Sequence, residues 1–150
     1  MITLKRTDSD NKDFIQLVKA LDADLAAYYK EEILFYDALN NIDFIKSAVV
    51  VYNENDDPIG CGGIKKYSQT EVEIKRMYVQ SEYRGKGISS ILLQELENWA
   101  KEQHYKKCVL ETLKEKPYAI KFYEKNDYKE TSNFGEYINA ENSICFEKNL

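Results

Sequence analysis

The segment EVEIKRMYVQSEYRGKGISSILLQELENWA, residues 71–100, decides the fold that we predict for this chain. Its first part alternates charged residues with apolar ones such as Val72 and Ile74, which is the period of a β-strand. Two glycines follow, and apolar residues then recur at helical spacing: Ile88, Ile91, Leu92, Leu96, Trp99 and Ala100. The segment therefore predicts a strand, a glycine-rich turn and an amphipathic helix.

The glycine-rich turn is suited to hold a phosphate group. Its backbone N–H groups and the unpaired N–H groups of the first helical turn point at one spot, where the helix dipole favours an anion. A glycine-rich turn alone is a weak signal, because an ordinary strand-to-helix connection uses the same residues. With a strand before it and a helix after it, we expect a phosphorylated cofactor here.

Length and composition indicate one globular domain over residues 1–150. Hydrophobic residues make up 43% of the 150 and charged residues 31%, which is ordinary for such domains. The net charge of −5 argues against non-specific nucleic-acid binding, which needs a basic surface. No apolar run has the length of a membrane span, and the first residues lack the apolar region of a signal peptide. We expect no nucleic-acid partner and no membrane partner.

The three cysteines, Cys61, Cys108 and Cys145, lie far apart without CxxC spacing, each in a run that reads as a strand. We expect buried reduced thiols rather than disulfides or a zinc site, and hence a reducing cytoplasm. His104 is the only histidine, so it cannot form a metal cluster or a triad. It is expected to be exposed or to cap the central helix. We expect no metal.

The N-terminal part reads as a strand over residues 2–6 followed by a helix. Residues 7–10 (TDSD) offer the N-cap. One face of the helix is apolar: Phe14, Leu17, Val18, Leu21, Leu25 and Tyr28. A second helix or a continuation of the first is expected over residues 33–39.

Further strands are predicted at residues 47–52, 59–67, 107–112, 128–131 and 143–148. The strand at 59–67 contains Gly60, Gly62 and Gly63, which indicate a bulge or a close backbone approach. Short connections predict an antiparallel meander over residues 47–79. The helix between the central strand and the next one predicts that those two strands are parallel. A short helix starts at Pro117, and residues 126–127 are expected to end it in a left-handed conformation.

The central segment resembles the GNAT superfamily of acyl-CoA-dependent N-acetyltransferases. Arg84-Gly85-Lys86-Gly87-Ile88-Ser89 is similar to its pyrophosphate loop, with a serine where glycine or alanine is usual. Residues 76–79 resemble its splayed central strand, and residues 119–128 its tyrosine-bearing helix. Asp127 and Lys116 depart from the usual glycine and asparagine. The motifs cover residues 71–128, and the element order matches over nearly the whole chain.

The resemblance implies a fold of the α/β class (α+β type). The sheet would be mixed, mainly antiparallel and of six to seven strands, splayed at the central parallel pair and flanked by about four helices. It also implies acetyl-CoA as co-substrate. The expected cofactor-binding residues are Met77, Tyr78, Val79, Arg84, Gly85, Lys86, Gly87, Ile88, Ser89 and Ser90. The turn would wrap the pyrophosphate, with charge from Arg84 and Lys86, and the pantetheine arm would pair with the backbone of Met77 and Val79.

Acyl transfer from a thioester to an amine needs a base, an oxyanion donor and an acid for the thiolate. Glu73 stands where several family members place the base, and Glu111 on the neighbouring strand is the second candidate. The backbone N–H of Val79 is the expected oxyanion donor, and Tyr123 matches the usual general acid. The alternatives are a surface carboxylate for Glu73 and a core tyrosine for Tyr123.

The predicted activity is transfer of an acetyl or small acyl group to a primary amine by direct attack in a ternary complex. A rival is a non-catalytic acyl-CoA-binding regulatory module, and a third interpretation is binding of an unrelated nucleotide. The acceptor is a small-molecule or peptide amine. The acidic, tyrosine-rich segment 22–37 is either a solvated helix surface or a wall of the acceptor pocket, and it weakly favours a cationic acceptor. A homodimer is compatible with these expectations.

Overall fold

A computed structural model describes residues 1–29 and 45–150 of the chain. Seven strands form one sheet in the order β1-β2-β3-β4-β5-β7-β6. The strands are β1 (Thr3–Thr7), β2 (Ser47–Tyr52), β3 (Pro58–Lys66), β4 (Glu71–Val79), β5 (Lys107–Leu113), β6 (Lys129–Thr131) and β7 (Ser143–Asn149). Among these described strands, only β4 and β5 pair in parallel, which confirms the predicted mixed, mainly antiparallel sheet. The predicted antiparallel meander over β2, β3 and β4 is also confirmed.

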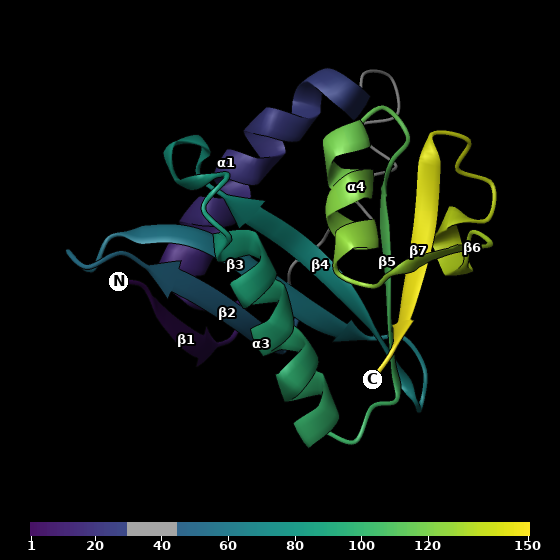
Figure 1. The fold of residues 1–150 in the computed structure, drawn as a ribbon, viewed down its shortest axis with the longest axis horizontal. Helices are drawn as coiled ribbons and strands as arrows, with labels where there is room; N and C mark the ends of the chain where they lie inside the picture. The colour runs from purple at the N-terminus through teal and green to yellow at the C-terminus, as the bar shows by residue number, and fades with distance from the viewer. Residues whose placement is uncertain (30–44) are drawn as a thin grey trace.

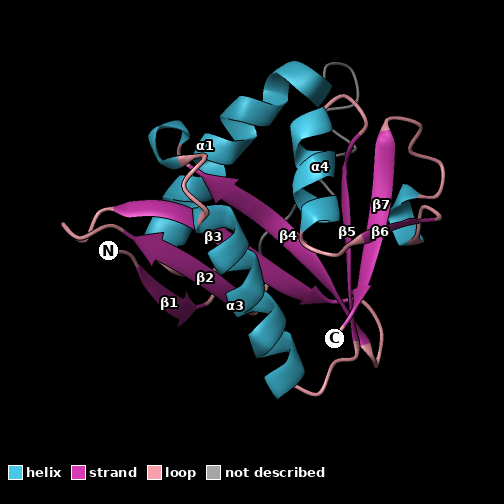
Figure 2. Cartoon of the chain, in the orientation of Figure 1, coloured by secondary structure: helices cyan, strands magenta, loops and turns pink. Residues whose placement is uncertain are grey.

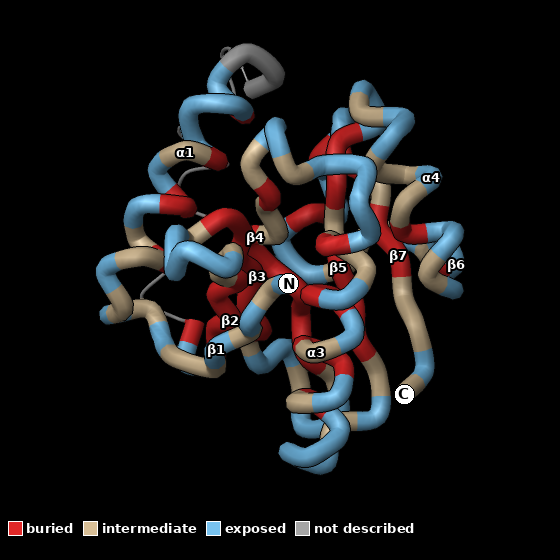
Figure 3. The backbone as a smooth tube through the Cα atoms, turned by 60° about the vertical axis from the view of Figure 1, so that its left-hand side comes forward, coloured by how far each residue is buried: buried red, intermediate tan, exposed pale blue. Residues whose placement is uncertain are grey.

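Helices cover both faces of the sheet (Figures 1 and 2). The helices are α1 (Lys12–Tyr29), α3 (Ile88–Glu102) and α4 (Pro117–Lys125). The β2 strand shows the layering, because successive side chains of a strand point to opposite faces. Val49 and Val51 pack in the cluster under α3 and α4, whereas Ala48 and Val50 pack in the cluster under α1. Two cores therefore lie on opposite sides of one sheet, and buried backbone runs through its centre (Figure 3).

The helix α1 buries the predicted stripe: Phe14, Leu17, Val18, Leu21 and Leu25. The predicted N-cap at residues 7–10 is wrong, because the side-chain oxygen of Asn11 accepts the N–H of Phe14 at 3.0 Å. In α3, Ile91 shares the predicted apolar spacing but is 48% exposed near the start of the helix. Periodicity identified both helices but not the details of their first turns.

A β-bulge interrupts β4 at Arg76. Between the pairs Cys61–Tyr78 and Gly63–Lys75, β3 advances by two residues and β4 by three. Arg76 has a φ of 60°, an unusual value for a residue with a side chain. The extra residue puts Lys75 and Arg76 on the same face: Lys75 contacts Tyr137 there, and the Arg76 guanidinium contacts Asp22 of α1. The glycines of β3 indicated the irregularity, but the additional residue is on the partner strand.

The glycines of β3 instead allow close approach. A Cβ at Gly62 would lie 2.7 Å from Met77 Sδ and 2.8 Å from Leu96 Cδ1. We therefore expect Gly62→Ala to lower the free energy of unfolding by about 1–3 kcal/mol, as overpacked core sites do. Urea unfolding of the variant and the wild type measures this. Equal stability would contradict the close approach.

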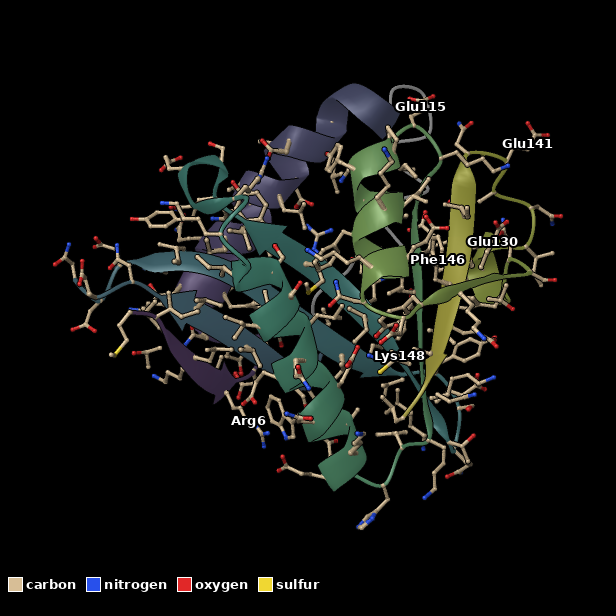
Figure 4. The ribbon with its side chains drawn as sticks, viewed as in Figure 1. Arg6, Glu115, Glu130, Glu141, Phe146 and Lys148 are labelled. Atoms are coloured by element: carbon tan, nitrogen blue, oxygen red, sulfur yellow. The ribbon has the colours of Figure 1, made fainter. Side chains whose placement is uncertain are left out.

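Two side chains at opposite ends of the sheet anchor it to α3, and both are labelled in Figure 4. Arg6 of β1 donates to Glu95 at 2.9 Å and to Glu102 at 2.7 Å and 2.8 Å. Lys148 of β7 donates to Glu97 at 3.0 Å. The Arg6 guanidinium also lies over the ring of Trp99, which is half-buried at the edge of the core. The helix that begins at the glycine turn is thus fixed from both sides.

The remaining expectations of the fold have mixed outcomes. The expected strands are confirmed to within about one residue at each end, and the cysteines are buried and free. His104 is confirmed as an exposed helix-terminal residue, with φ 71°, and Asp127 adopts the expected left-handed conformation, also with φ 71°. The second helix, or continuation of the first, that was expected over residues 33–39 lies outside the described residues. Single-domain organisation and a cytoplasmic location stay predictions.

Candidate active site

The strands β4 and β5 part soon after they begin to pair. Their ladder contains Glu71–Lys107, Val72–Cys108 and Glu73–Val109, and the strands then diverge (Figure 1). A pocket of about 310 Å³ occupies the opening. It is lined by Leu21, Asp24, Leu25, Glu73, Ile74, Lys75, Arg76, Met77, Tyr78, Val79, Arg84, Ser89, Glu111, Thr112, Leu113, Lys116, Tyr118, Ala119, Phe122, Tyr123 and Tyr137. The splay predicted at the central parallel pair is present.

The pocket connects the two faces of the sheet. On the α3 and α4 side it is lined by Ser89 and Tyr123, and on the α1 side by Leu21 and Tyr137. Residues from both faces of the sheet therefore line one continuous space. The parted strands supply a passage that a continuous ladder would close.

The backbone of Val79 faces this passage. The N–H of Gln80 donates to Ile59 O at 2.9 Å, so Gln80 and Ile59 form a hydrogen-bonded pair. The next pair, Val79 with Gly60, is then of the non-hydrogen-bonded type, whose N–H and C=O groups point away from the neighbouring strand. Consistently, the Val79 carbonyl accepts a hydrogen bond from Arg84 Nε at 2.7 Å on that side. The Val79 N–H is directed towards the opening between β4 and β5.

The glycine turn requires glycine for its backbone. Gly85 has a φ of 77° and Gly87 a φ of 81°, values in the left-handed region that disfavours side chains. A Cβ at either glycine would have no heavy atom within 4 Å, so the surface there is open among the described residues. Gly87 is the N-cap of α3 and makes no side-chain capping bond, so the first N–H groups of the helix remain for an anion.

The charged and hydroxyl side chains of the turn have contacts of their own. The Arg84 guanidinium donates to the Val79 carbonyl and to Asp24 of α1 at 3.3 Å, so it holds the turn against β4 and α1. Lys86 lies over the ring of Tyr83 at 5.4 Å. Ser90 accepts a hydrogen bond from Asn126 at 3.3 Å, which ties the start of α3 to the end of α4. The groups left open at the turn are therefore backbone groups rather than these side chains.

Tyr123 projects from α4 into the pocket wall and is 8% exposed. Its ring packs against Tyr128 and Phe146 at centroid distances of 5.8 Å and 6.3 Å. Burial, and secondarily the charge of Glu111, raises the pKa of Tyr123 above its usual value. Tyr123 is therefore protonated at neutral pH and able to donate a proton.

Glu73 is buried rather than a surface carboxylate. Tyr137 Oη donates to Glu73 Oε2 at 2.8 Å, and Lys75 Nζ lies 3.6 Å from the same oxygen. Lys75 also donates to Tyr137 Oη at 3.1 Å. Burial lowers the pKa of Lys75, and the Glu73 charge acts in the opposite direction. These three side chains form a connected group on the α1 side of the pocket, which we call the Glu73–Lys75–Tyr137 cluster.

Glu111 lies across the opening on β5. Ser143 Oγ donates to Glu111 Oε2 at 2.5 Å. The pKa of Glu111 is raised to about 7, mainly by burial; the Glu73 charge contributes to the rise, whereas the Ser143 hydrogen bond, Lys75 and Lys116 oppose it. A carboxyl group with this pKa is half-ionised near neutral pH, which suits proton transfer.

The sequence did not identify several pocket residues. In the sequence, Lys75 continues the alternation of Glu71 and Glu73, and Arg76 would fall on the opposite face of a regular strand. Only the bulge and the burial of both side chains place them together at the pocket. Tyr137 comes from a 3₁₀ turn (Gly135–Tyr137) in what reads as a polar loop. Its one sequence signal was the high tyrosine content of the chain. Of the acidic segment 22–37, Asp24 lines the pocket and Asp22 pairs with Arg76, whereas residues 30–37 lie outside the described residues.

The described residues contain no cluster of three or more His, Cys, Asp or Glu side chains that could hold a metal ion. Within the same residues, no helix has both the length and the apolar character needed to span a bilayer.

Comparison with known sequences gives a family match. The model of the Acetyltransferase (GNAT) family matches residues 15–128. An IAA acetyltransferase of Azospirillum brasilense is 27% identical over 150 residues, covering 99% of this chain and 98% of that protein. An uncharacterized N-acetyltransferase of Dictyostelium discoideum is 49% identical over 51 residues. This match covers 34% of this chain and only 24% of that protein.

Comparison with solved structures gives the same fold. A Klebsiella pneumoniae protein provisionally named an acyl-CoA N-acyltransferase superposes with a TM-score of 0.82 at 26% identity, covering 100% of this chain and 98% of that one. A GNAT family acetyltransferase of Elizabethkingia anophelis, solved with acetyl-CoA bound, has a TM-score of 0.70 at 20% identity. Coverage is 99% of this chain and 98% of that one.

Proposed function

Since the chain belongs to the GNAT acetyltransferase family, we propose that it transfers an acetyl or small acyl group from acetyl-CoA to a primary amine. The attack is direct, with both substrates bound. The observation that carries the proposal is the pocket between β4 and β5, which is lined by residues from both faces of the sheet. One face has the anion-binding turn for the donor, and the other has carboxylates for the acceptor amine.

The donor side suits coenzyme A. The open backbone at Gly85 and Gly87 and the first N–H groups of α3 would hold the pyrophosphate. The pantetheine arm would run along β4 and place the thioester carbonyl near the Val79 N–H, which would stabilise the oxyanion. The Elizabethkingia protein of the same fold has acetyl-CoA bound, which supports this choice of donor.

The reacting groups would come from three elements. A carboxylate beside the opening, Glu73 of β4 or Glu111 of β5, takes the proton of the incoming ammonium. The amine nitrogen attacks the thioester carbon, and the bond from carbon to sulfur breaks. Tyr123 of α4 gives its proton to the departing thiolate. The acceptor is a small-molecule or peptide amine, and this proposal does not depend on which one.

Thiol release tests the proposal. The protein is mixed with acetyl-CoA and a panel of primary amines, and free thiol is followed with a chromogenic disulfide. The expected result is amine-dependent thiol release with at least one amine. Coenzyme A binding without thiol release on any amine would favour a non-catalytic acyl-CoA-binding module, and ATP binding without coenzyme A binding would favour an unrelated nucleotide.

The glycine turn supplies a prediction about donor affinity. In Gly87→Ala the left-handed conformation becomes unfavourable by about 1–2 kcal/mol, so coenzyme A should bind roughly tenfold more weakly. Calorimetric titration measures the change. Gly135→Ala is the matched control, because Gly135 also has a positive φ, 52°, but does not line the pocket. The control should lose stability and keep its affinity, and an equal loss of affinity in both variants would contradict the site.

A further inference from the structure

Arg76 is a buried cation in an unfavourable backbone conformation. Its φ of 60° lies in the left-handed region, which residues with a side chain disfavour. The bulge that requires this conformation brings the buried guanidinium to the α1 side of the sheet, and Arg76 lines the pocket between β4 and β5. Strained residues of this kind concentrate at functional sites, where the surrounding fold holds them in place. Arg76 is therefore a candidate for contact with a ligand.

The described residues satisfy only part of the Arg76 guanidinium. Its Nη2 donates to Val18 O at 3.3 Å and to the carboxylate of Asp22, both in α1. Its Nε is buried and has no hydrogen-bond partner among the described residues. A buried donor without an acceptor is costly, and the cost is larger for a charged group. A carboxylate that bonded Nε and Nη2 together would remove this cost, because two parallel hydrogen bonds fit the planar guanidinium.

The ion pair between Arg76 and Asp22 is unevenly buried. The Arg76 side chain is 2% exposed, whereas the Asp22 side chain is 54% exposed. A half-exposed carboxylate is well solvated by itself, so it loses little when it turns towards water. A buried guanidinium needs a counter-charge close by, because water does not solvate it. Asp22 can therefore give way to another carboxylate, while Arg76 stays in place to bind it.

The acidic side chains of α1 near the pocket already have cationic partners. Asp22 pairs with Arg76, and Asp24 pairs with Arg84 at 3.3 Å. In the described part of the acidic segment, these two pairs weaken the reason to expect a cationic acceptor. The carboxylates of β4 and β5 that line the pocket can still receive one ammonium group. An acceptor with one ammonium group and one carboxylate would match these charges.

We propose that the acceptor is an amino acid whose ammonium group lies at the carboxylates of β4 and β5 and whose carboxylate binds the Arg76 guanidinium. This inference rests on the acetyl transfer proposed above and names the class of its acceptor. Arginine suits the task, since its planar fork bonds both oxygens of a carboxylate. A polyamine is disfavoured at the same place, because its second positive charge would meet the charge of Arg76.

The first test is a panel of amines in the thiol-release assay. The panel pairs each L-amino acid with its carboxamide, which keeps the amine and the side chain and loses the negative charge, and it includes spermidine. For at least one amino acid, kcat/KM should exceed that of the carboxamide by about 10- to 100-fold, as expected for charge-assisted hydrogen bonds. If the wild type used carboxamides or spermidine as well as any amino acid, the inference would be overturned.

The variant Arg76→Gln tests the residue itself. The KM for the preferred amino acid should rise, and its preference over the carboxamide should fall to within about threefold, with kcat little changed. A purely structural arginine would instead lower activity on both amines alike, which would contradict the proposal. Arg6→Gln is the matched control, because Arg6 also joins a strand to a helix through ion pairs but does not line the pocket. This control should keep the wild-type preference.

The variant Asp22→Asn tests the same contact without any change at Arg76. Its side chain is half exposed, so the variant should fold, and thermal unfolding checks this. Without the competing charge of Asp22, the KM for the amino acid should fall about three- to tenfold, and the KM for the carboxamide should not change. An equal change in both KM values, or a higher KM for the amino acid, would speak against binding at Arg76.

The inference and the proposed function fail in different ways. Thiol release with carboxylate-free amines alone would overturn the inference and leave the proposed function intact. If no amine gives thiol release, the proposed function fails, and calorimetric titration of amino acids into protein saturated with coenzyme A still tests the site. Wild type should then bind an amino acid at least about tenfold more tightly than Arg76→Gln does. Equal affinity in the two proteins would overturn the inference.

Discussion

Tyr123→Phe should lower kcat by about 100-fold or more and leave coenzyme A affinity within about threefold. The substitution removes only the hydroxyl, so the ring still packs against Tyr128 and Phe146. Without the proton donor, the departing sulfur keeps its negative charge in a pocket that solvates the charge poorly. Steady-state thiol release gives kcat, and titration with coenzyme A gives the affinity.

Tyr128→Phe is the matched control for this result. The Tyr128 hydroxyl donates to Glu97 at 2.9 Å in the core and does not line the pocket. Its loss should lower the free energy of unfolding by about 1–3 kcal/mol, because a buried carboxylate loses a donor, and should change kcat little. If Tyr123→Phe kept near-normal turnover, Tyr123 would be a packing residue and not the acid.

Glu111 should make the stability of the protein depend on pH. Burial raises the pKa of Glu111 from 4.5 to about 7 in the folded chain. Between these two values the unfolded chain has released the proton and the folded chain still binds it. Raising the pH through this range therefore favours the unfolded chain, and the free energy of unfolding should fall by up to about 3 kcal/mol. Below pH 4.5 this contribution is fully present, and above about pH 7 no further loss is expected.

Urea unfolding of the wild type and Glu111→Gln at several pH values isolates this contribution. The variant lacks the titrating group, so the difference in unfolding free energy between the two proteins should change from about pH 4.5 to pH 7 and then level off. Lys75, whose pKa is lowered by burial, is present in both proteins. A difference that stays constant with pH would show that Glu111 titrates normally in the folded state.

The sequence predicted the parts of the fold that local patterns determine. Alternating apolar and polar residues predicted the strands, and helical spacing predicted α1, α3 and α4. The positive φ of Gly85 and Gly87 was also predictable, because glycine adopts such values without strain. The side of the pocket where we propose that the donor binds belongs to this group. It consists of one continuous segment whose strand, turn and helix are adjacent in the chain.

The side of the pocket that we propose for the acceptor could not be predicted in the same way. It is assembled from β4, β5, α1 and a 3₁₀ turn that are far apart in sequence, and its chemistry depends on burial. Glu73 alternates with apolar neighbours and reads as exposed, but Tyr137, 64 residues away, covers it. The predictions of the α1 N-cap and of the bulged residue were wrong for a related reason. At each place, several neighbouring residues are chemically able to take the role.

The bulge at Arg76 also bears on how this sheet can change by mutation. If Arg76 is left out, the residues on either side of it alternate between the faces, with Lys75 and Tyr78 towards α1 and Met77 and Val79 towards α3. Loss of the single codon for Arg76 would therefore leave the inward and outward pattern of β4 intact. We expect such a deletion variant to fold, with a straighter β4 and a narrower opening beside β5. Gain or loss of one codon can thus convert a plain sheet into one with a ligand passage, without any change in the core.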